Sequence, residues 1–271
     1  MKKTHFKNEL ALADTCKKGA EGPVVKRIQE WLCLTPLRFP EAVTATAVDG
    51  KFGSATERAV RNFEEAIGQK QTGVVTPELF HRLAEPLAMA FQAPPVAGPA
   101  SIHQGILHYA RIHLRQRATE LQSAQEQNLG PWVRSYCDGY EGSPFKWCMG
   151  FVQSVLDLAA SGAGRDYTAI MPASLSCDVV AMAGRQNGRL TDSKSVRSNP
   201  KQVLPGDVFL LRYPNLNDWY HTGIITRVVG DCFETIEGNT DSKGSSNGTA
   251  VFTRTRNFRT TTIDVFTVEG L

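Results

Sequence analysis

The segment Phe145-Lys146-Trp147-Cys148-Met149-Gly150-Phe151-Val152 decides the fold of the second half of this chain. It places Cys148 directly before apolar residues that recur at the spacing of one helix face, through Val155, Leu156 and Ala159. A thiol in the first turn of a buried helix lies at the positive end of the backbone dipole, which favours the nucleophilic thiolate form. The segment therefore predicts a helix with a reactive cysteine at its start.

The composition is that of an ordinary globular protein of one or two domains. The chain has 271 residues, 41% hydrophobic and 21% charged, with a net charge of +3. This small positive charge does not indicate nucleic-acid binding. No apolar stretch approaches the roughly 18 residues of a membrane span. No apolar segment follows the basic N-terminal residues, so we expect synthesis in the cytoplasm without a cleavable signal peptide.

The cysteines are expected to be reduced, because a chain of this length without a signal peptide folds in a reducing compartment. Apart from Cys148 they are interpreted as buried structural residues. There is no CxxC pair and no HExxH motif, so neither a metal site nor a cofactor is predicted. The six cysteines are Cys16, Cys33, Cys137, Cys148, Cys177 and Cys232.

A short segment rich in proline and glycine, residues 93–100, divides the chain into two predicted units. Three prolines and a glycine within eight residues propagate neither a helix nor a central strand. Residues 1–92 carry three amphipathic helical patterns, and we expect Ser54 to cap the second of them with Glu57 at the capping-box position. Residues 101–271 form the second unit.

Three short motifs follow one another in the first unit. They are Glu21–Gln29, Val48–Gly53 and Gly73–Thr76. In this order they resemble the three-helix peptidoglycan-binding domain, with two departures: Glu64, where the family usually has glutamine, and the long connection over residues 34–47. The resemblance implies an all-α module that binds bacterial peptidoglycan.

The second unit changes from helical to strand-forming patterns along its length. A helical segment of about Ile102–Gln127 precedes Cys148, and the chain becomes rich in strand formers after residue 200. Helices followed by an antiparallel sheet predict an α+β domain. The strands are expected at residues 208–211, 221–229, 232–237 and 261–267.

Cysteine-dependent amide hydrolysis needs a base for the thiol and a polar group that orients this base. His221 begins an apolar strand, and Glu237 lies on the next one. A regular two-residue turn at Gly230-Asp231 would place Glu237 opposite Ile224, on the face away from His221. A contact between His221 and Glu237 therefore requires a turn with an odd number of residues or a bulge near Gly230.

Four motifs occur in one order along the second unit. They are Trp147–Val152, Pro205–Val208, His221–Ile225 and Ile236–Thr240. As a set they resemble the CHAP amidases and peptidases, papain-like relatives of the NlpC/P60 cell-wall hydrolases. The resemblance implies a papain-like α+β domain.

The resemblance also implies roles for individual residues. Cys148 is the expected nucleophile, His221 the expected base and Glu237 the expected orienting residue. Asn239 is a second polar group that replaces or assists Glu237. No cofactor is implied.

Several neighbours of the expected site are assigned from the sequence. The oxyanion hole needs a second donor beside the Cys148 N–H, which we expect from the segment that contains Asp138 and Tyr140. Trp147 is interpreted as a packing residue or cleft wall, and Met149 as bulk that narrows the cleft. Tyr213, Trp219 and Tyr220 either line the cleft or pack on the sheet, and both interpretations stay open. A basic cluster is interpreted as a solvated face: Arg254, Arg256 and Arg259.

The two resemblances together predict a peptidoglycan hydrolase. It would cut an amide bond within the stem peptide or the N-acetylmuramoyl-L-alanine bond, in the periplasm, after non-classical export or holin-mediated release. A phage endolysin and an antibacterial effector with an immunity protein both fit. The alternatives are a non-catalytic wall-binding or structural protein and a cytoplasmic amidase of a small peptide conjugate.

Overall fold

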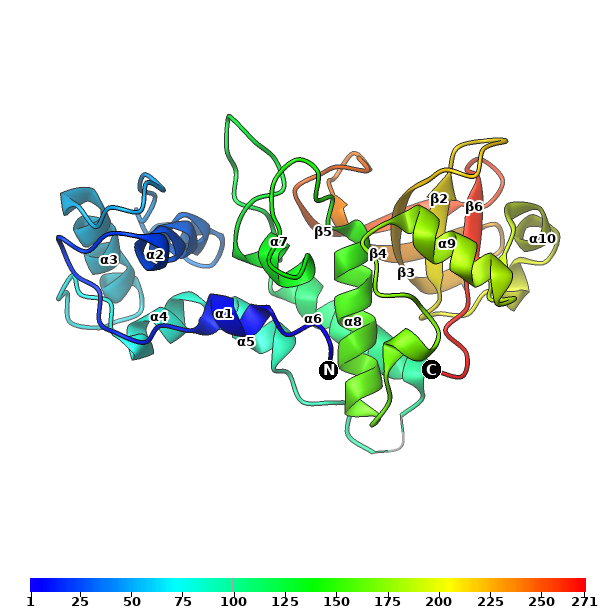
Figure 1. The fold of residues 1–271 in the computed structure, drawn as a ribbon, viewed down its shortest axis with the longest axis horizontal. Helices are drawn as coiled ribbons and strands as arrows, with labels where there is room; N and C mark the ends of the chain where they lie inside the picture. Colours follow the sequence, from blue (N-terminus) through cyan, green and yellow to red (C-terminus); the bar gives the residue numbers. More distant parts are fainter. Residues whose placement is uncertain (99) are drawn as a thin grey trace.

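The computed structural model describes residues 1–98 and 100–271, and its architecture is α+β, as expected (Figure 1). Pro99, which belongs to the predicted linker, lies outside the described residues. The helices are α1 (Phe6–Leu10), α2 (Pro23–Leu34), α3 (Ser54–Ala66), α4 (Pro77–Leu83), α5 (Glu85–Phe91), α6 (Ile102–Arg115), α7 (Pro131–Tyr136), α8 (Cys148–Gly162), α9 (Cys177–Gln186) and α10 (Ser193–Ser198). The strands are β1 (Leu190–Thr191), β2 (Val208–Arg212), β3 (Trp219–Val229), β4 (Cys232–Thr240), β5 (Ala250–Asn257) and β6 (Ile263–Phe266).

The first predicted unit is helical, but one of its caps differs from the expectation. Thr76 caps α4 by accepting a hydrogen bond from the Leu79 N–H at 3.2 Å. The prediction that Ser54 caps α3 is wrong, because Ser54 is already the first helical residue and the extended Gly53 takes the cap position. The Glu57 side chain forms ion pairs with basic side chains instead of a capping box.

Helix α6 is shorter than predicted. It ends at Arg115 rather than near Gln127, because Arg117 adopts a left-handed conformation with φ of 53°. The chain then runs along the outer strand β5, where the Val251 N–H donates to the Ala118 carbonyl at 2.9 Å. This segment therefore covers a sheet edge that would otherwise expose unpaired backbone groups.

The sheet is antiparallel, with strand order β1-β6-β2-β3-β4-β5. Strand β2 is buried on both faces: Val208 and Leu210 belong to the large hydrophobic core, and Phe209 and Leu211 to a second, smaller core. The sequence patterns missed β1 and β5, the helix α9 and the short helices α1, α7 and α10. Helix α8 lies between the sheet and the N-terminal helices and packs against β3, β4 and α6 (Figure 1).

The two predicted units are packed against each other. Helices α1 and α2 contact α7, α5 contacts α6, and one hydrophobic core continues through both units. The beginning of the predicted linker is docked on α6, since the Ala93 and Pro94 carbonyls are hydrogen-bonded to Tyr109 and His108. The division into two domains at residues 93–100 stays a prediction. In the structure, the two predicted units pack into one continuous body.

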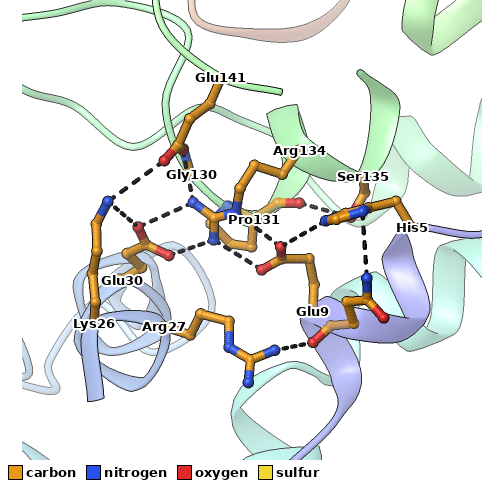
Figure 2. A network of polar contacts seen from close by, with 11 residues as sticks. His5, Glu9, Lys26, Arg27, Glu30, Gly130, Pro131, Arg134, Ser135 and Glu141 are labelled. Carbon is orange, nitrogen blue, oxygen red and sulfur yellow. Dashed lines mark hydrogen bonds and ion pairs between the residues drawn. The ribbon is translucent and has the colours of Figure 1, made fainter. Parts of the chain in front are cut away.

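A buried ion cluster around Arg134 of α7 lies at this junction (Figure 2). The Arg134 guanidinium donates to Glu9 of α1 at 2.8 Å and to Glu30 of α2 at 2.6 Å. It also donates to Glu141 at 2.7 Å. Glu9 and Glu30 are 3% and 1% exposed, and burial raises the pKa of Glu30 against the opposing effect of Arg134. One guanidinium therefore binds carboxylates from three separate segments, and Lys26 adds a second positive charge beside Glu30 and Glu141.

Replacing Arg134 should test this junction. Arg134→Met leaves two buried carboxylates without their main partner, so we expect the free energy of unfolding to fall by about 3–5 kcal/mol. Denaturant titration of the full chain measures this change. In the control, Arg227→Met, the lost pair with Glu234 is exposed, and the loss should stay below about 1 kcal/mol. Equal losses in the two variants would contradict a stabilising role for the cluster.

Candidate active site

Cys148 is the first residue of α8, as the sequence predicts. The preceding residue, Trp147, is held by Asn239 of β4. The Asn239 amide is oriented so that both its oxygen and its nitrogen are hydrogen-bonded. The oxygen accepts from the Trp147 N–H at 3.2 Å, and the nitrogen donates to the Gly248 carbonyl at 2.6 Å. Asn239 has a φ of 55°. Its side chain therefore positions the start of α8, while Glu237 makes the contact with His221.

Two glycines allow α8 to approach its neighbours closely. A Cβ at Gly238 would lie 2.6 Å from the Cβ of Phe151, so β4 can pass this close to the helix only with glycine there. A Cβ at Gly150 would lie 2.6 Å from the Tyr136 carbonyl oxygen at the end of α7. Gly150 and Gly238 are thus required for the same reason, because a side chain at either position would clash where α8 packs against a neighbour.

His221 of β3 and Glu237 of β4 meet, with 2.9 Å between Nε2 and Oε2. The turn between the strands is the two-residue type, because Val229 pairs with Cys232. The required bulge is present farther along, between Ile225 and Arg227, and it restores the shared face. The expectation of an odd turn or a bulge is met by the bulge.

Arg256 of β5 is the residue of this site that the sequence patterns missed. Its guanidinium donates to both carboxylate oxygens of Glu237, at 2.6 and 2.5 Å, and Thr235 donates to one of them at 2.5 Å. Burial raises the pKa of Glu237, but the hydrogen bonds of Arg256 and His221 outweigh it and lower the pKa to about 2. Glu237 is therefore ionised and fixed in orientation.

The expected solvated cluster of three arginines is therefore wrong for Arg256, whose side chain is only 13% exposed. Arg254 donates to the carbonyls of residues 241 and 242, and Arg259 pairs with Asp231. Side chains alternate between the two faces of the strand along residues 250–257, and this alternation could have indicated the face of Arg256. Arg256 is paired with Phe233 of β4, so the two side chains share a face of the sheet. Only the pairing of β5 with β4 brings this arginine to Glu237.

Each of Cys148 and His221 shifts the pKa of the other toward its charged form, and the two residues are called the charge pair below. The pKa of Cys148 lies well below its usual value, through hydrogen bonds with Cys177, His221 and the Met149 N–H that outweigh burial. Burial lowers the pKa of His221, but hydrogen bonds with Cys148 and Glu237 raise it to about 9. Among the described residues, the buried His221 Nδ1 makes no hydrogen bond, so this atom is free to exchange a proton with the thiol. The arrangement favours thiolate and imidazolium near neutral pH.

A cleft of about 560 Å³ opens at Cys148. Of the two interpretations of Tyr213, Trp219 and Tyr220, the structure supports cleft lining, and the rings of Tyr213 and Tyr220 lie 4.4 Å apart. Its charged groups are Lys146 and Asp218. The lining residues are Pro144, Phe145, Lys146, Cys148, Leu175, Ser176, Cys177, Tyr213, Asp218, Trp219 and Tyr220.

The other sequence-predicted neighbours lie elsewhere. Asp138 pairs with Lys3 at 2.6 Å, and Tyr140 is exposed and stacks on Phe145. Trp147 is fully buried and stacks on Tyr136 at 5.4 Å, so it is a packing residue. Met149 is buried as well and does not belong to the cleft lining, so the expectation that it narrows the cleft is wrong.

Comparison with known proteins gives a match for part of the first predicted unit. Residues 21–83 match the family model described as "Putative peptidoglycan binding domain". This confirms the peptidoglycan-binding resemblance of the N-terminal unit. The comparison with curated proteins found no match. In the part of the chain that the structure describes, no helix is both long and apolar enough to cross a membrane, and no group of three or more potential metal ligands occurs.

The charge pair predicts how Cys148 responds to pH. Because His221 stabilises the thiolate, the midpoint of Cys148 alkylation by iodoacetamide should lie well below the usual thiol pKa of about 8.5. His221→Ala should raise this midpoint by at least about one pH unit. Peptide mass spectrometry measures the rates, with the exposed Cys232 of the same digest as reference. Identical midpoints in the two proteins would show that His221 does not activate the thiol.

Gly223 tests the packing beneath the charge pair. An added Cβ would lie 2.8 Å from the Glu237 Cγ and 2.8 Å from the Phe209 ring. Gly223→Ala should therefore destabilise the fold by about 1–3 kcal/mol and raise the midpoint of Cys148 alkylation by displacing Glu237. Gly53→Ala is the control, since nothing lies within 4 Å of its added Cβ. An unchanged midpoint in Gly223→Ala would contradict the proposed packing constraint.

Proposed function

We propose that this protein is a peptidoglycan hydrolase that cleaves an amide bond with Cys148 as its nucleophile. The observation that carries the proposal is the buried contact of His221 with Glu237, together with a cleft-lining Cys148 whose lowered pKa depends in part on His221. The match of residues 21–83 to a peptidoglycan-binding family supports association with the cell wall. The four ordered motifs of residues 101–271, which resemble CHAP enzymes, support the reaction class.

The geometry is suited to acyl transfer. The Cys148 thiolate attacks the amide carbonyl, and the unsatisfied backbone N–H groups of the first turn of α8 face the developing negative charge. The His221 imidazolium gives its proton to the departing amine and then takes a proton from water, which hydrolyses the thioester. Glu237 stabilises the imidazolium and fixes the ring, and Arg256 keeps Glu237 in place.

The junction at Arg134 gives the wall-binding unit a further role in this proposal. A groove of about 600 Å³ in this unit is lined by residues 38–43 of the long connection and by three residues of α3, Asn62, Glu65 and Ala66. Because the unit is docked rather than flexibly tethered, binding to the wall fixes the orientation of the Cys148 cleft as well as its local concentration.

Two choices within the proposal stay open. The bond is either within the stem peptide or between N-acetylmuramic acid and L-alanine, and the setting is either phage lysis or attack on a rival bacterium, with an immunity protein in the second case. The rivals from other classes are a wall-binding protein without turnover and a cytoplasmic amidase of a small peptide conjugate. The charge pair at Cys148 favours an enzyme over the former, and the peptidoglycan-binding match argues against the latter.

Digestion of purified sacculi tests the function. The full-length protein should release fragments whose masses name the bond, and Cys148→Ala should release none while still sedimenting with the sacculi. His221→Ala should lower the rate by at least about 100-fold, the usual contribution of a general base. The wild-type rate should fall as the pH rises through about 9, where His221 loses the proton needed by the leaving amine.

Equal products from wild type and Cys148→Ala would refute the cysteine mechanism. Sedimentation without digestion by the wild-type protein would support the non-catalytic wall-binding alternative instead. Activity on soluble peptides combined with no sedimentation would favour the small-conjugate amidase.

A further inference from the structure

Cys177 is a second thiol in the cleft, and the proposed hydrolysis does not use it. Cys177 begins α9 as Cys148 begins α8, and both line the same cleft. Each thiol shifts the pKa of the other, the pKa of Cys148 downward and that of Cys177 upward. Both cysteines are free and buried, so the sequence-based interpretation of Cys177 as purely structural misses its contact with the nucleophile.

The position of Cys177 is fixed from both sides. Ser176 caps α9 by accepting a hydrogen bond from the Val179 N–H at 3.3 Å. Asp178 accepts one from the Trp219 N–H of β3 at 2.6 Å. Trp219 is two residues before His221, so the start of α9 is attached to the strand that carries the proposed base. The fold therefore holds the Cys177 thiol at the cleft that Cys148 also lines.

We propose that Cys177 is a resolving cysteine that forms a reversible disulfide with Cys148 when a peroxide oxidises the nucleophile. The Cys148 thiolate attacks one peroxide oxygen, which breaks the O–O bond, releases hydroxide and leaves a sulfenic acid. The Cys177 sulfur then attacks the sulfenic sulfur, the S–O bond breaks, and water leaves with the Cys177 proton. In total, two thiols lose two electrons and two protons, and hydrogen peroxide becomes two molecules of water.

The electrostatics of the pair favours the second step. The hydrogen bond with Cys148 is the main reason, with burial, that the pKa of Cys177 is raised well above its usual value. Oxidation of Cys148 to a neutral sulfenic acid removes the thiolate charge. Cys177 can then lose its proton more easily, at the stage when it is needed as a nucleophile. In the reduced protein, Cys177 is also the largest cause of the lowered pKa of Cys148.

Cys137 is the competing thiol nearby. The charge of Cys148 contributes to the raised pKa of Cys137. Cys137 is nevertheless fully buried at the end of α7 and does not line the cleft. Its Sγ lies 4.0 Å from the Phe145 carbonyl oxygen. Burial raises its pKa to about 12. A peroxide that enters through the cleft therefore meets Cys148 and Cys177.

Peptide mapping of the oxidised full chain tests the proposal. Trypsin places the three thiols in separate peptides, residues 135–146, 147–165 and 166–185. After hydrogen peroxide and without reductant, we expect 147–165 linked to 166–185, with the mass of their sum less two hydrogens. Dithiothreitol should restore nearly all of the free Cys148 thiol. A link from 147–165 to 135–146, or Cys148 sulfinic acid without any link, would overturn the proposal.

Two variants at position 177 distinguish the loss of a resolving thiol from a folding defect. Cys177→Ser and Cys177→Ala should lose the linked peptide and accumulate irreversibly oxidised Cys148, so that less than about half of its thiol returns with dithiothreitol. Cys232→Ser, which removes an exposed thiol, should behave as wild type. Full recovery of Cys148 in both position-177 variants would refute the resolving role.

Formation of the disulfide does not depend on the proposed function. Its expected consequence, a reversible loss of hydrolysis, does rest on that function. The disulfide itself is measured by mass, so it can form or fail to form in a protein that digests no sacculi. Sacculus digestion that stops after peroxide and returns with dithiothreitol is expected of wild type. Digestion that persists in protein with a complete Cys148–Cys177 link would contradict the role of Cys148 as nucleophile while leaving the disulfide established.

Discussion

The buried contact between His221 and Glu237 is the constraint on which the candidate site depends. Both side chains are fully buried, and a charged pair that has lost water is stable only when its remaining hydrogen-bonding groups are satisfied. Three features of the sheet meet this requirement. The bulge after Ile225 sets the register, Gly223 leaves room for the Glu237 side chain, and Arg256 occupies both carboxylate oxygens.

The same principle operates at the junction of the two predicted units. Arg134 lies among carboxylates from α1, α2 and the loop after α7, and each of these would be unfavourable without a cation. The N-terminal arm adds to this junction, because the Lys2 and Lys3 N–H groups both donate to Asp157 of α8 at 2.7 Å. The helix that carries Cys148 at its start is thus held near its other end by the first residues of the chain.

Most of the main elements could be predicted from the sequence. The start of α8 at Cys148 and the strands of residues 208–211 and 221–229 follow from local patterns, and the structure contains all of them. The wrongly predicted end of α6 concerns a local feature, but its cause is a tertiary contact. Helix α6 ends early where Arg117 turns the chain toward the edge of β5, and that edge is not visible from nearby residues.

The sequence by itself determined which residue types were available for the chemistry and on which kind of element each one lies. It placed Cys148 at a helix start and His221 and Glu237 on neighbouring strands, and strand periodicity required either an odd-numbered turn or a bulge between them. Only the tertiary structure decided the partners. Arg256 reaches Glu237 across a strand pairing, and Cys177 reaches Cys148 because two separate helices begin at one cleft. Hydrophobic periodicity specifies the face of a single element, whereas these contacts depend on how several elements pack in space.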